Sequence, residues 1–83
     1  MNSKALPPLS PLAQTIIIKG LYEHYKGFRY KIIAVARHSE TLDELVVYQA
    51  LYGEEGVWVR PLAMFLENVI IDEKPQPRFR LVQ

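Results

Sequence analysis

The longest regular alternation of polar and apolar side chains spans residues 28–38. Phe28, Tyr30 and Ile32 occupy even positions, and Arg29 and Lys31 lie between them. Because successive side chains of a β-strand point to opposite faces, the first half of this segment predicts a strand with one apolar and one cationic face. The second half is apolar at both parities, which is typical of a strand that bends and is covered on both sides.

Shorter segments complete a predicted order of elements. Residues 21–25 and 45–52 are expected to flank the long strand, with a turn at Gly27 that favours positive φ. The four-residue loop 53–56 predicts a hairpin into a strand at 57–60. Pro61 cannot donate to a ladder and suits the start of a helical turn at 62–66, after which residues 67–71 resume β character. Four strands, a helical turn and a fifth strand predict a mostly β, SH3-like five-strand barrel over residues 19–83.

Residues 1–18 precede this pattern as a proline-containing N-terminal arm. Pro7, Pro8 and Pro11 favour extended backbone, and a Pro-x-x-Pro spacing of this kind occurs in SH3 ligands and also by chance. The β-branched residues 15–18 could add a strand or pack as part of the arm. We expect an unstructured arm that the fold of residues 19–83 does not need.

Composition narrows the classes of function. Eighty-three residues predict one domain, and the absence of cysteine excludes disulfides and thiolate metal sites. Ten basic and nine acidic side chains give a net charge of +1, which removes the global electrostatic argument for nucleic acid. No apolar run approaches the roughly 20 residues that a membrane helix requires. The prolines interrupt any signal-peptide core, so we expect a cytoplasmic protein without a membrane partner.

The densest cluster of functional groups is Arg37, His38, Ser39, Glu40 and Thr41. A hydrolase would use Ser39 as nucleophile and His38 as its base, but neighbouring strand residues point apart and no Gly-x-Ser-x-Gly elbow surrounds the serine. The block can instead end a strand, with hydroxyls bonded to local backbone, or form a loop that contacts a ligand. His38 and His24 are the only histidines. Since a zinc site needs three or four protein ligands, we expect no metal and no cofactor.

Tyr48, Tyr52, Trp58 and Arg60 form a second constellation on the predicted hairpin. Aromatic rings beside an arginine can stack a planar ligand, a base or a proline-rich peptide. Large rings also fill the core of a small barrel, and both interpretations stay open. If the hairpin is regular, Tyr52 lies nearly opposite Val57. We also predict that Trp58 anchors the hairpin between residues 45–52 and 57–60, with a ring whose size suits a small core.

Several blocks of this sequence resemble a bacterial family catalogued as domain of unknown function 1653. They include Gly20-x-Tyr22-x-His24-Tyr25-Lys26-Gly27, Ala36-Arg37-His38-Ser39-Glu40-Thr41, and Trp58-Val59-Arg60-Pro61. The resemblance covers about residues 20–80 and implies a compact bacterial domain without an assigned activity. It supplies no mechanism, cofactor or partner.

Together these observations predict a binding or interaction module rather than an enzyme, with an unknown protein or small ligand as partner. The alternative is a binder of single-stranded nucleic acid or nucleotides that uses the basic strand face beside the aromatic hairpin. A small hydrolase is the less supported third class. We expect any ligand site where residues 37–41 meet the surface of Tyr48, Trp58 and Arg60.

Overall fold

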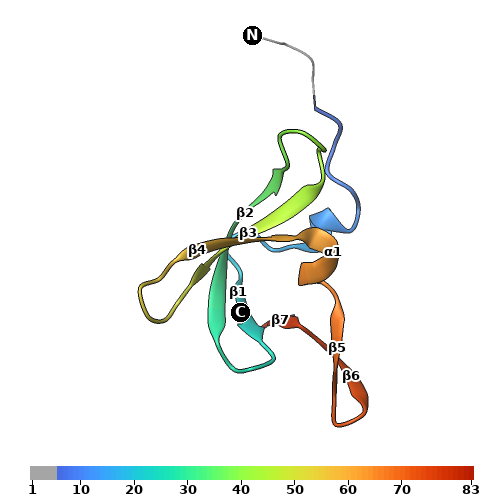
Figure 1. The fold of residues 1–83 in the computed structure, drawn as a ribbon. Coiled ribbons are helices and arrows are strands. Elements are labelled where there is room, and N and C mark those ends of the chain that lie inside the picture. The colour runs from blue at the N-terminus through green and yellow to red at the C-terminus, as the bar shows by residue number, and fades with distance from the viewer. Residues whose placement is uncertain (1–5) are drawn as a thin grey trace.

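A five-stranded antiparallel sheet forms the centre of the computed structural model, which describes residues 6–83 (Figure 1). The strand order across the sheet is β4 (Val57–Pro61), β3 (Glu44–Ala50), β2 (Arg29–Arg37), β1 (Leu21–His24) and β7 (Phe79–Leu81). The predicted helical turn is confirmed as α1 (Leu62–Phe65). Within residues 6–83 no ladder joins β4 to β7, so the sheet has two open edges and the expected barrel is not closed.

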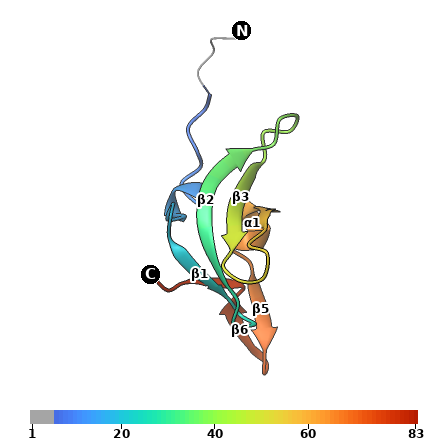
Figure 2. The same ribbon diagram turned by 90° about the vertical axis from the view of Figure 1, so that its left-hand side faces the viewer.

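The predicted bend in the long strand is confirmed by a register shift between Ile32 and Ala34, where β2 pairs with β3. An extra residue in one strand disrupts the ladder and bends the strand, so Ile33 marks a β-bulge. Figure 2 shows β2 and β3 curving along their length. The curvature wraps one face of the sheet, here called the core face and defined by Tyr22, Ile32, Val46 and Tyr48, around the buried side chains.

The fifth strand of the sheet differs from the predicted one. β5 (Asn68–Ile71) pairs with β6 (Lys74–Pro77) in a separate hairpin, and β7 takes the place beside β1. Asp72 and Glu73 both have positive φ, which is the backbone of a tight hairpin turn. Prolines are tolerated in a short strand at a sheet edge, so Pro75 and Pro77 do not prevent this pairing.

Aromatic rings dominate the core. Phe65 of α1 is fully buried and stacks on Phe79 of β7, with ring centroids 4.2 Å apart and planes inclined by 7°. Tyr22 and Tyr48 each place a ring 5.6 Å from Phe65. Helical turn and sheet are therefore held together mainly by ring packing around one residue. No helix within residues 6–83 is long and apolar enough to cross a membrane.

The N-terminal arm packs against the sheet, so the expectation of an unstructured arm is wrong for residues 6–18. It contains the 3₁₀ turn η1 (Ala13–Thr15), whose Ala13 is buried in the core together with Ile16. Ser10 donates from its backbone N–H and its hydroxyl to the carboxylate of Glu44, at 2.7 and 2.6 Å. The domain boundary at residue 18 stays an expectation, but residues on both sides of it share one core.

Candidate functional site

Strand pairing places several sequence-predicted site residues on the core face. Tyr48 lies opposite both Ile32 and Trp58, and Val46 lies opposite Arg60. Paired residues of antiparallel strands project to the same side, so Trp58 and Arg60 extend the core face to the edge of the sheet. The predicted hairpin is confirmed, although Val57 lies opposite Gln49 and not close to Tyr52 as expected.

Of the two aromatic residues that could lie in the core or at the surface, Tyr48 is buried and Trp58 is exposed. Tyr48 is only 5% exposed, because the rings of Phe65 and Phe79 cover it. Trp58 is 59% exposed, since it lies on the edge strand beyond the cover of α1. The expectation that Trp58 anchors the core is therefore wrong, and its indole is available for contacts.

Replacing Trp58 with alanine is expected to lower the free energy of unfolding by less than about 1 kcal/mol, because most of the ring is already in water. Urea unfolding of the dilute protein, followed by far-ultraviolet circular dichroism, measures this difference. Tyr48→Ala is the matched comparison from the opposite position on β3, and should cost about 3–5 kcal/mol. Equal losses in the two variants would contradict the placement of Trp58.

Arg60 is held over the aromatic core without a carboxylate partner. Its Nε donates to the hydroxyl of Tyr48 at 3.2 Å, and its guanidinium carbon lies 5.6 Å from the centre of the Phe79 ring. The salt bridges of residues 6–83 involve Arg29, Arg78 and Arg80, and none involves Arg60. A partly buried cation without a counter-charge leaves bidentate donor capacity for an anion.

His24 lies close enough to Arg60 for the charge of the guanidinium to affect the pKa of the imidazole. Burial lowers the pKa of the imidazole first, and the positive charges of Arg60, Lys26 and Arg78 lower it further. The ring packs edge-on against Phe79 and accepts the backbone N–H of Lys26 at Nδ1, at 3.2 Å. A neutral ring with the proton on Nε2 fits this geometry, and the surroundings favour an added negative charge.

Tyrosine hydroxyls complete the polar rim of the core face. The hydroxyl oxygens of Tyr30 and Tyr52 are 2.6 Å apart, and burial, followed by Tyr52, raises the pKa of Tyr30 to about 12. Tyr52 is half-exposed and packs on Phe28, with ring centroids 4.7 Å apart. The phenol of Tyr30 therefore remains a neutral hydrogen-bonding group. Sequence reasoning did not connect His24 and Tyr30 with this site, although their even spacing on β1 and β2 places them on its face.

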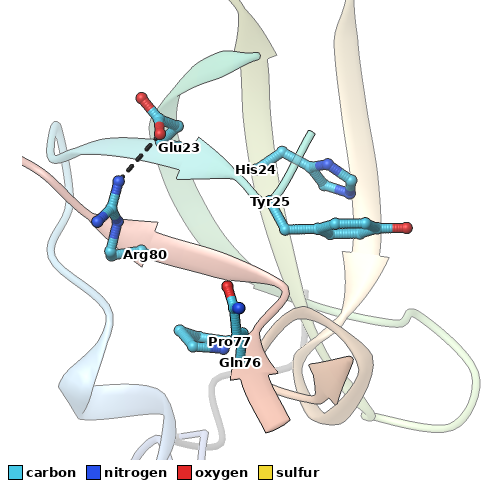
Figure 3. A pocket seen from close by; sticks show the side chains of 6 residues that line it. All are labelled: Glu23, His24, Tyr25, Gln76, Pro77 and Arg80. Carbon is cyan, nitrogen blue, oxygen red and sulfur yellow. Dashed lines mark hydrogen bonds and ion pairs between the residues drawn. The ribbon is translucent and has the colours of Figure 1, made fainter. Parts of the chain in front are cut away.

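A small polar pocket of about 150 Å³ opens beside His24 (Figure 3). Its lining residues are Glu23, His24, Tyr25, Gln76, Pro77 and Arg80. Glu23 accepts from Arg29 and from Arg80, each at 3.0 Å, and the pKa of Glu23 is lowered mainly by Arg29. The charges of Glu23 and Arg80 in this pocket are thus already paired within the protein. A ligand would find less uncompensated charge here than at Arg60.

Residues 37–41 lie apart from Trp58, at the turn between β2 and β3. His38 accepts the backbone N–H groups of Glu40 and Thr41 at Nδ1, at 3.1 and 3.3 Å, and the hydroxyl of Thr41 accepts from Asp43 at 3.1 Å. These bonds fit the strand-end interpretation, in which side chains stabilise the local turn. In residues 6–83 no hydrogen bond joins His38 to Ser39, so no nucleophile–base pair is formed there.

The block contacts the arm instead of the aromatic hairpin. Arg37 donates to the carbonyl oxygen of Pro7, and His38 borders a groove of about 600 Å³ between arm and helix. The groove is lined by Ser10, Leu12, His38, Asp43, Glu44, Leu45, Pro61, Leu62 and Ala63. The structure therefore divides the predicted site residues into two places, one at this turn and one at Tyr48, Trp58 and Arg60. No cluster of metal-ligating side chains is present in residues 6–83.

Comparison with known proteins identifies relatives without assigning a function. Residues 20–81 match the family described as "Protein of unknown function (DUF1653)". The fold is similar to the crystal structure of a DUF1653 protein from Bordetella bronchiseptica, at 39% sequence identity and a TM-score of 0.75. That similarity covers 84% of this chain and 91% of the Bordetella chain. No curated protein matches the sequence.

Proposed function

Because the chain belongs to the DUF1653 family, whose description names no function, we propose from its geometry that it is a binding module for small planar anions. The ligand would lie on the open edge of the core face, beside Trp58, Arg60 and His24. The strand order, with a helical turn before the last strand of the sheet, supports an SH3-like wiring for this module. Small β domains of that class usually bind through residues carried at the margins of a rigid sheet.

The unpaired guanidinium of Arg60 carries the proposal. Its contacts with Tyr48 and Phe79 fix its position but neutralise no charge. A phosphate or carboxylate can accept from the remaining guanidinium N–H groups, and a charge-assisted pair of this kind is about twice as strong as a neutral hydrogen bond. Burial is the main cause of the lowered pKa of His24, and the neighbouring positive charges that lower it further favour the same anion.

Trp58 supplies the preference for a planar group. Its exposed indole lies two residues from Arg60 on the same face of the edge strand. Stacking of a base on an aromatic side chain contributes about 1–3 kcal/mol and tolerates any planar ring. A nucleotide combines the two features, since it carries an anion and a planar ring on one molecule.

Single-stranded RNA is the second candidate, because it presents the same phosphates and bases in series. The basic strand face supports it less, since Arg29 and Arg80 both pair with Glu23. Affinity for RNA would fall steeply with salt, whereas a single phosphate contact gives a shallow dependence. The salt slope of binding therefore separates a mononucleotide site from an RNA site.

Arg60→Gln is expected to weaken binding of a mononucleotide about 10-fold or more, because a hydrogen bond to a charged group is lost. Trp58 is the only tryptophan, so quenching of its fluorescence by AMP, by benzoate or by oligouridylate measures binding directly. The same variant removes a positive charge beside His24, and NMR titration should show the pKa of His24 rising.

Arg37→Gln is the matched control, because it removes the same group at the distant β2–β3 turn. It should leave the quenching constants unchanged. Loss of binding in Arg37→Gln with retention in Arg60→Gln would move the site to that turn. Failure of all three probes to quench the native protein would contradict the proposal.

A further inference from the structure

Strand β4 is an unpaired edge of the central sheet. It pairs with β3 on one side, and no other strand of residues 6–83 lies beside it (Figure 1). Val57, Trp58 and Val59 are 60%, 59% and 57% exposed, so large apolar side chains are accessible on both faces of this strand. Proteins usually block such edges with charged residues, proline or a bulge; β4 carries Arg60 and Pro61 at its C-terminal end, and residues 57–59 carry none of these.

The register of the hairpin identifies the backbone groups that point away from the sheet. The N–H of Ala50 donates to the carbonyl of Gly56, so this pair is hydrogen-bonded. Hydrogen-bonded and non-hydrogen-bonded pairs alternate along antiparallel strands, which makes Tyr48 and Trp58 a hydrogen-bonded pair. It follows that the N–H and C=O groups of Val57 and Val59 point outward from the edge.

We propose that β4 pairs with β4 of a second copy of this chain, antiparallel and about a twofold axis that passes beside Trp58. Val57 of each copy then pairs with Val59 of the other, and every outward N–H and C=O of these residues finds a partner. Trp58 lies opposite its own counterpart in a non-hydrogen-bonded pair, where Cα atoms approach to about 4.5 Å and side chains make their closest contacts. Two aromatic residues in such a pair stabilise the association.

A second copy fits this edge better than another extended segment for two reasons. The first is charge, because the antiparallel register brings the acidic turn of Glu54 and Glu55 in one copy beside Arg60 in the other. The second is closure, because pairing of β4 with itself makes a closed dimer, whereas pairing of β4 with the opposite edge, β7, leaves a free edge on every added chain unless a ring closes. The dimer joins two core faces at Trp58 without requiring the proposed ligand, and it competes with that ligand because it covers Trp58 and places Glu54 and Glu55 beside Arg60.

Sedimentation equilibrium of the full chain, with Val59→Pro and Val59→Thr, tests the pairing. Val59 and Val47 form a non-hydrogen-bonded pair, so the N–H of Val59 points away from β3. Proline at position 59 therefore removes no hydrogen bond to β3, and proline is tolerated at such edge positions. The native protein and Val59→Thr should reach the mass of two chains as concentration rises, and Val59→Pro should keep the mass of one. A native protein that stays monomeric at every soluble concentration overturns the proposal, as does a dimeric Val59→Pro.

A second variant keeps the test valid if the proline disturbs the fold. The chain contains no cysteine, so Trp58→Cys introduces a single thiol at the proposed axis. A non-hydrogen-bonded pair has the Cα separation that a disulfide accepts, and mild oxidation should therefore link this variant rapidly into dimers. Ile70→Cys, on the exposed β5–β6 hairpin, is the collision control. Equal rates of linkage in the two variants would also overturn the proposal.

Discussion

Phe65→Ala is expected to lower the free energy of unfolding by about 3–5 kcal/mol. The ring of Phe65 is fully buried, stacks on Phe79 and meets Tyr22 edge-on. Its removal leaves a cavity between the helical turn and the sheet that the rigid neighbouring rings cannot fill. Domains are stable by only about 5–15 kcal/mol, so this loss is a large share of the total.

Urea unfolding measures the loss as a shift in midpoint at constant slope. Met64→Ala is the control, because Met64 belongs to the same helical turn and its side chain is largely exposed. This control should shift the midpoint little. A loss below about 1 kcal/mol for Phe65→Ala would show that α1 is not part of the core.

Ile16→Ala is expected to cost about 2–4 kcal/mol, because it truncates an arm side chain that lies in the core. Ile16 is 6% exposed, while its neighbour Ile17 is 48% exposed. Ile17→Ala is thus a control with the same chemical change at the adjacent position, and it should cost less than about 1 kcal/mol. Thermal unfolding of both variants gives the comparison.

The same experiment decides whether the arm belongs to the folding unit. Equal and small effects at both positions would restore the expectation that residues 19–83 fold without the arm. A large effect at Ile16 alone would show that the arm covers the core. Deletion of residues 1–14 should then reduce stability too, because it removes Ala13 and the bonds from Ser10 to Glu44.

Local patterns predicted most of the sheet. Alternation along residues 28–38 located β2, the apolar second half anticipated its bend, and Gly27 has the positive φ that its turn was expected to need. The loop between Gly53 and Gly56 and the stop at Pro61 located β4 and α1. Each of these features depends on residues close together in the sequence.

Long-range pairing explains what the sequence pattern missed. β7 is three residues long and pairs with β1 across more than half of the chain, so no local signal distinguished it from a tail. The β-branched residues 15–18, which include the buried Ile16, left packing of the arm open, but Ala13 gave no sign of burial because it is small and its neighbours are polar or exposed. Both features depend on contacts that exist only after the sheet has formed.

Only the local part of the candidate site was predicted, because the rest depends on contacts between distant strands. The spacing of Trp58 and Arg60 on one strand placed them on one face, which the pairing with Tyr48 and Val46 supports. The sequence could not show that α1 covers Tyr48 and leaves Trp58 open. Nor could it bring His24 to Arg60, since β4 and β7 are opposite edges of the sheet and only its curvature brings Arg60 over Phe79, beside His24.

Backbone amide chemical-shift mapping of the native protein with AMP tests the central claim most directly. We expect the largest changes at Trp58, Arg60 and His24, together with a rise in the pKa of the His24 ring as the anion binds. Changes confined to the turn at residues 38–43, with His24 unaffected, would contradict the proposed site.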